Sequence, residues 1–135
     1  MNKLAHLQML QTVIARMASN SFMLKGWSVT LVAALFAVAA DKAKVSFVAL
    51  AYFPALVFWF LDGYFLRQER LFRALYDQAR SLAEANITFS MDTTAVAQGV
   101  SSWAAACISR TLWLFHGTVV ASIAVVMWCL SLPHA

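Results

Sequence analysis

The chain has 135 residues, of which 62% are hydrophobic and only 12% are charged. This composition excludes an ordinary soluble domain and is typical of a small polytopic membrane protein. The net charge of +4 does not indicate direct nucleic-acid binding, because the basic residues lie beside apolar segments, where they act as topology and headgroup signals. The sequence therefore predicts one all-α integral membrane unit, residues 1–135, whose first partner is the lipid bilayer.

An amphipathic helix is predicted over residues 4–22. Its apolar side chains recur every three or four residues opposite a polar face, and they are Leu4, Leu7, Leu10, Ile14 and Met17. Two interpretations remain open. The helix either packs on the cytoplasmic surface of its own protein or lies in the headgroup layer as an interfacial anchor.

Two membrane spans are expected next, over residues 24–40 and 45–66. The short segment 41–44 connects them tightly, so the two spans form a helical hairpin. Small side chains in the first span favour close packing, because lipid supplies no hydrophobic drive between helices. Pro54 interrupts the second span, where it frees one backbone carbonyl group.

The second span continues without a break into a basic amphipathic helix, residues 67–84. Its apolar seam requires a partner helix, which is either the N-terminal helix or a neighbouring subunit. We expect the oligomer or partner contact to use the seam and the arginines beside it: Phe65, Arg67, Arg70, Phe72, Arg73, Leu75, Ala79 and Leu82.

A further helix is predicted over residues 93–109, with Asp92 as its cap. Its polar first turns favour a position on the membrane surface, and entry into the bilayer is the alternative. A third span is expected over residues 111–132, because this run is apolar and has tryptophans near both ends.

The basic residues also predict an orientation. Three precede the first span and four follow the second, whereas two lie in the connecting turn. By the positive-inside rule, the N-terminus and the segment between the second and third spans are cytoplasmic, and the C-terminal residues lie outside.

Three ionisable residues in or near the spans are candidates for a gating site: Asp62, Lys25 and His116. Ionisable groups within a membrane usually face protein or water and often have a function. In the simpler interpretation Asp62 lies at the interface and pairs with Arg67 or Lys25, and His116 is a hydrogen-bonding residue between helices. In the functional interpretation Asp62 lines a pore or forms a contact between subunits that gates one, and His116 binds a proton or a metal.

Catalysis is not expected. The chain has no recognisable hydrolase, metalloprotease or nucleotide-binding motif, and it has no length for a separate catalytic domain. Cys107 and Cys129 lie too far apart on a helix to pair, and no ligand spacing indicates a metal site. We therefore expect no enzyme activity, no cofactor and no metal.

The N-terminal amphipathic helix, the hairpin of two spans and the run FWFLDGYFLRQERLFRALYDQAR together resemble the SLATT-type small membrane proteins of bacteria. The resemblance is clearest over residues 10–84, and the third span departs from the two-span plan. It implies a bacterial inner-membrane effector in antiviral defence, which forms a homo-oligomer and perturbs the membrane when a soluble partner encoded nearby signals.

Three functions are compatible with these features. The first is a pore-forming, non-enzymatic effector that leaks ions when triggered. The second is a membrane anchor or sensor that recruits a soluble protein through its basic helix. The third is a small transporter component, against which the chain shows no inverted repeat.

Overall fold

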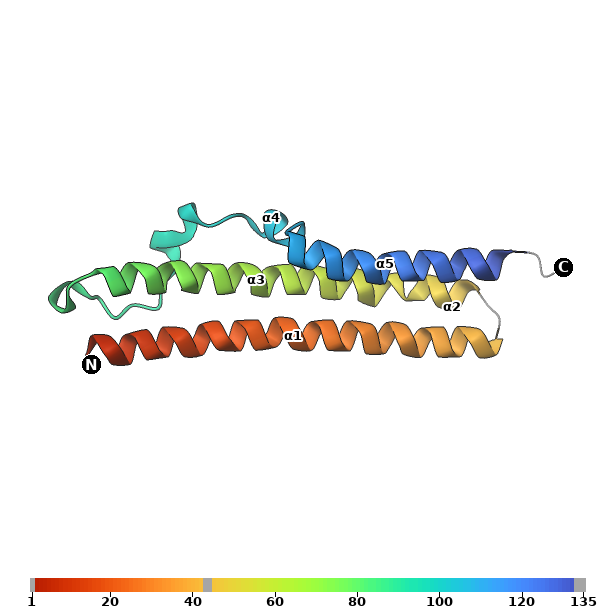
Figure 1. Ribbon diagram of the computed structural model, residues 1–135, viewed down its shortest axis with the longest axis horizontal. Helices are drawn as coiled ribbons and strands as arrows, with labels where there is room; N and C mark the ends of the chain where they lie inside the picture. The colour runs from red at the N-terminus through yellow and green to blue at the C-terminus, as the bar shows by residue number, and fades with distance from the viewer. Residues whose placement is uncertain (1, 43–44, 133–135) are drawn as a thin grey trace.

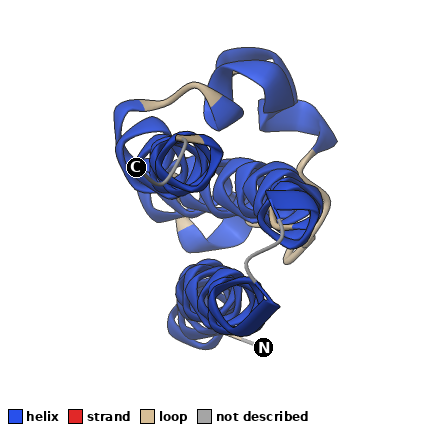
Figure 2. Cartoon of the chain, turned by 90° about the vertical axis from the view of Figure 1, so that its right-hand side faces the viewer, coloured by secondary structure: helices blue, strands red, loops and turns tan. Residues whose placement is uncertain are grey.

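The computed structural model describes residues 2–42 and 45–132, and within these residues it is helical without strands. Three of its helices, α1, the α2–α3 pair and α5, are long and apolar enough to cross a membrane. Figure 1 shows them lying nearly parallel, with α3 between α1 and α5. Viewed from the end, they occupy the three corners of a triangle (Figure 2).

Helix α1 spans Lys3–Lys42 as one element. The amphipathic residues 4–22 and the span expected over 24–40 are therefore two halves of one helix. No proline interrupts this run, and Gly26 is its one glycine, so nothing local ends the helix between the halves. Asn2 caps its start, because the Asn2 side-chain oxygen accepts a hydrogen bond from the amide of Ala5 at 2.9 Å.

The second hydrophobic run is divided into α2, Val45–Leu50, and α3, Tyr52–Ser81. Ala51 separates the two helices three residues before Pro54. Proline has no amide hydrogen for the carbonyl four residues earlier, and its ring clashes with that carbonyl. The interruption that Pro54 predicts is therefore present. Residues 43 and 44 of the expected connection lie outside the described residues.

Beyond the apolar part of the bundle, the first half of α1 packs against the second half of α3. Their contact forms a small hydrophobic core, in which Leu10 is fully buried against Leu75 and Ala79. The apolar seam of α3 thus has a partner within its own chain, and this is the first of the two partners considered from the sequence. At the far end, the Lys3 ammonium donates to the carbonyl groups of Arg80 and Leu82 at 2.8 and 2.6 Å, which caps the C-terminus of α3.

The prediction of one helix over residues 93–109 is wrong. The chain forms two short 3₁₀ turns, Glu84–Asn86 and Thr94–Gly99, followed by the short helix α4, Trp103–Cys107. The carboxylate of Asp92 accepts from the amide of Thr94 at 2.9 Å and makes a local turn. The cap of α4 is Ser102, whose hydroxyl accepts from the amide of Ala105 at 3.2 Å. From Thr94 onward this segment runs back along α3 on the side away from α1 (Figure 1).

Helix α5 spans Arg110–Ser131, close to the span expected at 111–132. Its Ile123 joins Val32 of α1 and Val48 of α2 in a second hydrophobic core. Many large apolar side chains around this core point outward, among them Phe53 and Trp128, which are 75% and 65% exposed. Such a surface is covered by lipid when the helices cross a bilayer. Residues 133–135, expected outside the membrane, are not among the described residues.

The pairing of α1 with α3 can be tested at Leu10. We expect Leu10→Ala to lower the free energy of unfolding by about 2–5 kcal/mol, because it opens a cavity in a closed core. Leu4→Ala is the matched control, since Leu4 lies on the same helix but is 63% exposed, and it should have little effect. Thermal unfolding in detergent micelles measures both. Equal losses for the two variants would contradict this packing.

Candidate functional site

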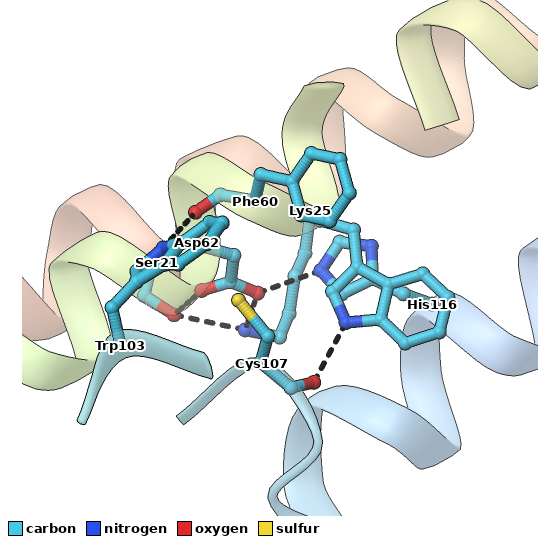
Figure 3. A network of polar contacts seen from close by, with 8 residues as sticks. Ser21, Lys25, Phe60, Asp62, Trp103, Cys107 and His116 are labelled. Atoms are coloured by element: carbon cyan, nitrogen blue, oxygen red, sulfur yellow. Dashed lines mark hydrogen bonds and ion pairs between the residues drawn. The ribbon is translucent and has the colours of Figure 1, made fainter. Parts of the chain in front are cut away.

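A cluster of polar side chains lies near one end of the apolar part of the three long helices. Its centre is the carboxylate of Asp62 on α3, which is fully buried. Ser21 and Lys25 approach it from α1, and His116 approaches it from α5 (Figure 3). The spacing of four residues places Ser21 and Lys25 on the same face of α1. The structure therefore brings Asp62, Lys25 and His116 together, although they are far apart in the sequence.

The hydrogen bonds use both oxygens of the carboxylate. Oδ2 accepts from the Lys25 ammonium at 2.5 Å and from the His116 ring at 2.8 Å. Oδ1 accepts from the hydroxyl of Ser21. The Lys25 ammonium also donates to the Ser21 oxygen at 2.8 Å. One carboxylate thus receives donors from two different helices, which joins α1, α3 and α5 at a single point.

The negative charge of Asp62 and the positive charge of Lys25 balance each other in this cluster. A buried carboxylate is costly unless a counter-ion and hydrogen bonds surround it, and the side chain of Lys25 is itself only 18% exposed. An ionised carboxylate only accepts, so Nε2 of His116 carries the hydrogen in this contact. Nδ1 of His116 is buried and has no hydrogen-bond partner among the described residues.

Aromatic side chains enclose the histidine. The ring of Trp59 stacks on the His116 ring, with centroids 5.8 Å apart and planes 11° from parallel. The ring of Phe115 meets His116 edge-on at 5.0 Å and lies 5.9 Å from the Lys25 ammonium, close enough for a cation–π contact. These rings keep the cluster in an apolar environment, which strengthens its electrostatic contacts.

Helix α4 covers the cluster from the side of α3. Gly63, next to Asp62, lets it approach closely, because a Cβ atom at this position would lie 2.3 Å from the sulfur of Cys107. Two indole groups fix the approach: Trp59 donates to the carbonyl of Cys107 at 2.8 Å and Trp103 donates to the carbonyl of Phe60 at 3.1 Å. Burial, with a smaller effect from the Asp62 charge, raises the pKa of the Cys107 thiol.

Four further residues belong to this site and were not predicted from the sequence: Ser21, Trp59, Gly63 and Cys107. The one local signal was the glycine beside Asp62, since a glycine inside a helix often marks a close approach. Of the two proposed partners of Asp62, the structure has Lys25 and not Arg67. The buried Nε of Arg67 has no hydrogen-bond partner among the described residues.

The residues expected at an oligomer or partner contact have varied environments. Leu75 and Ala79 are buried in the core with α1, and Phe72 packs beside them. Arg70 donates to the hydroxyl of Ser101 at 3.0 Å, and Arg73 pairs with Glu69 at 2.7 Å. The other members of the expected set are Phe65, which is partly buried against Tyr64, and Leu82, which is exposed.

The cluster is suited to holding or releasing three helices. Among the described residues, no group of three or more histidine, cysteine, aspartate or glutamate side chains is placed to hold a metal ion. The side chains present are joined by hydrogen bonds, and each of them points to Asp62. Loss of the Asp62 charge would leave the Lys25 ammonium without its counter-ion and would free the three helices from their common contact.

The Asp62–Lys25 pair predicts a large coupling free energy. Asp62→Leu alone should cost about 3–5 kcal/mol, because it strands a partly buried ammonium. Adding Lys25→Met should recover part of this loss, with a coupling of about 1–3 kcal/mol between the two sites. Thermal unfolding of the single and double variants in detergent measures the coupling.

The matched control for this cycle is the exposed Asp77–Arg80 pair on α3, in which both side chains are 63% exposed. Its coupling should be only about 0.3–0.5 kcal/mol, because water screens an exposed pair. Equal couplings for the two pairs would contradict a special role for Asp62.

The contact between α3 and α4 predicts the effect of enlarging Gly63. Gly63→Ala should destabilise the fold by about 1–3 kcal/mol, since the new methyl group overlaps the Cys107 sulfur. Cys107→Ala in the same chain should restore most of the loss. Gly26→Ala is the control, because a Cβ atom there would meet no described atom within 4 Å, and it should be neutral or stabilising. Thermal unfolding distinguishes these outcomes.

No protein-family model, no curated protein and no solved structure matches this chain. The resemblance to SLATT-type membrane proteins stays a hypothesis based on the sequence pattern.

Proposed function

We propose that this protein is a non-enzymatic effector of the bacterial inner membrane that permeabilises the membrane when a partner protein triggers it. The observation that supports the proposal best is the buried carboxylate of Asp62, which receives hydrogen bonds from both α1 and α5. We infer that this cluster is the latch of the resting form, and that its opening separates the three helices.

A contact made of charges is better suited to the role of a switch than to the role of a permanent support. A buried ion pair adds little net stability compared with well-packed apolar residues, whereas breaking it is strongly destabilising. In the proposed mechanism the helices have a second arrangement besides the one with the cluster closed, and in it the same polar groups need water or other partners. Polar groups that face the inside of an assembly provide a path for ions.

The trigger is proposed to act at the far end of the α1–α3 pair. Helix α3 runs without interruption from Tyr52, near one end of the bundle, past Asp62 to Ser81. Helix α1 carries Ser21 and Lys25 on an equally continuous element. A protein that binds the distal end can therefore shift both sides of the Asp62–Lys25 contact. The exposed guanidinium groups of Arg16, Arg73 and Arg80 favour an acidic partner surface.

The topology and the assembly belong to the same proposal. The excess of basic residues at the distal end favours its location in the cytoplasm, with the C-terminal end of α5 on the other side. The centre of one copy is filled by the side chains of the Asp62 cluster and its aromatic neighbours. We therefore expect the leak to require several copies, as the resemblance to SLATT-type proteins implies.

The latch predicts a gain of function. Bacteria that express Asp62→Asn should lose membrane potential without any trigger, because the neutral amide no longer balances Lys25. Bacteria that express the wild-type chain alone should keep their potential. A voltage-sensitive dye measures the difference, and immunoblots of membrane fractions confirm equal amounts of protein.

Asp77→Asn provides the control for this test. It makes the same chemical change at an exposed carboxylate, which pairs with Arg80 at 3.0 Å, and it should leave the potential unchanged. Lys25→Met should depolarise the cells as Asp62→Asn does. The latch is refuted if both cluster variants accumulate in the membrane and the potential stays normal.

The distal end also favours a second candidate function, a membrane anchor or sensor for a soluble protein. In that case the basic residues of α1 and α3 bind the partner and no leak occurs. Charge reversal at Arg73 and Arg80 would then release the captured partner, while the membrane potential would stay normal in cells that express any of the variants. Capture of a partner together with depolarisation supports the effector instead.

A further inference from the structure

A groove with a volume of about 810 Å³ runs between α1 and α5, within the range of about 300–1,000 Å³ that is usual for ligand sites. Figure 2 shows that these two helices lie apart, each beside the α2–α3 pair. The walls consist of residues from both helices, chiefly Val29, Ala33 and Phe36 of α1 and Leu114, Phe115 and Val119 of α5. The groove lies on the outer surface of the apolar bundle, where it faces lipid in a membrane.

Most of the groove presents hydrocarbon. Its hydroxyl groups in the middle of α5 are already satisfied, since Thr118 donates to the carbonyl of Leu114 at 2.6 Å and Ser122 donates to that of Thr118 at 2.8 Å. An occupant of this part therefore needs no polar groups. An acyl chain meets that requirement without leaving unpaired donors or acceptors.

The end of the groove at the start of α5 is different, because it is positive and unpaired. Arg110, the first residue of α5, lines the groove and makes no ion pair with any described residue. The hydroxyl of Thr111 beside it likewise donates to none of them. The first amides of a 22-residue helix add partial positive charge at the same place. No acidic side chain is among the described residues that line the groove.

We propose that this groove binds one anionic phospholipid. Its phosphate contacts the guanidinium of Arg110 and the hydroxyl of Thr111, and an acyl chain lies between α1 and α5 toward Ser122. The cationic end of the groove matches the phosphate headgroup of such a lipid, and the apolar remainder matches its acyl chain. Arginine is well suited to the contact because its planar group binds phosphate through two hydrogen bonds.

A second copy of the chain fits the groove less well. The chain has six acidic residues, and Asp62 is the one within the apolar levels, where Lys25 already neutralises it. A helix from another copy would therefore bring no free carboxylate to Arg110.

The lipid would contact Phe115, an aromatic side chain that borders the polar cluster. Phe115 lines the groove, and the same ring contacts His116 and lies near the Lys25 ammonium. Occupation of the groove would hold this ring against the cluster. The lipid site requires only that the helices cross a membrane, so it can be correct even if the proposed effector function is wrong.

Native mass spectrometry of the full chain, purified in detergent and titrated with phosphatidylglycerol or phosphatidylcholine, tests the site. The wild type should retain phosphatidylglycerol in preference to phosphatidylcholine, whose choline group repels Arg110. Arg110→Gln should weaken the binding of phosphatidylglycerol about fivefold, as expected for one basic residue at a lipid surface. Arg80→Gln, at an exposed position on the distal end, should bind like the wild type.

A second pair of variants tests the groove itself. Ala33→Phe places a ring in the groove and should abolish retention of the lipid, whereas Ala34→Phe, next to it but outside the groove, should not. Circular dichroism checks that both variants keep their helices. Equal binding of the two lipids by the wild type, or unchanged binding by Arg110→Gln, would overturn the proposal. A dimer that Ala33→Phe dissociates would also overturn it, since a second copy would then occupy the groove.

Discussion

The buried carboxylate of Asp62 constrains the arrangement of every long helix in this protein. An ionised group among apolar side chains needs a counter-ion and hydrogen bonds, and here α1 supplies Lys25 and Ser21 while α5 supplies His116. Side-chain hydrogen bonds of this kind fix the height of each helix along the bundle axis. Apolar contacts alone would allow helices to slide, because one hydrocarbon surface resembles the next.

Around this point the bundle has two parts of different character. On one side, α1, α2 and α5 enclose an apolar core and expose hydrophobic side chains, as a membrane requires. On the other side, α1 and α3 continue as a pair with its own small core around Leu10. Because both helices run through without a break, the polar cluster is mechanically connected to the distal end. A change at that end need not cross a flexible linker.

Much of this organisation could be predicted from the sequence. The three apolar runs, the interruption near Pro54 and the seam of α3 are local patterns of hydrophobicity and backbone chemistry. The shape of residues 93–109 could not be predicted, because Ser102 begins α4 only after the backbone turns at Val100, and contacts with α3 hold that turn. The meeting of Asp62 with His116 depends on the register of helices 54 residues apart in sequence. The roles of Ser21, which donates to Asp62, and Gly63, which admits α4, can be recognised only once that register is known.

The stability that the cluster adds to the fold does not by itself explain why charged residues are present there. An ion pair first has to lose its water, and this cost offsets much of the attraction between the charges. A charged contact differs in being all-or-none, since removal of one partner leaves the others unsatisfied at once. Nδ1 of His116 is buried at this contact without a hydrogen-bond partner among the described residues. The ring of Phe115 lies between the contact and the α1–α5 groove, because it touches His116 and lines the groove. The proposed lipid and the proposed trigger protein would therefore act on the same three-helix junction from different sides.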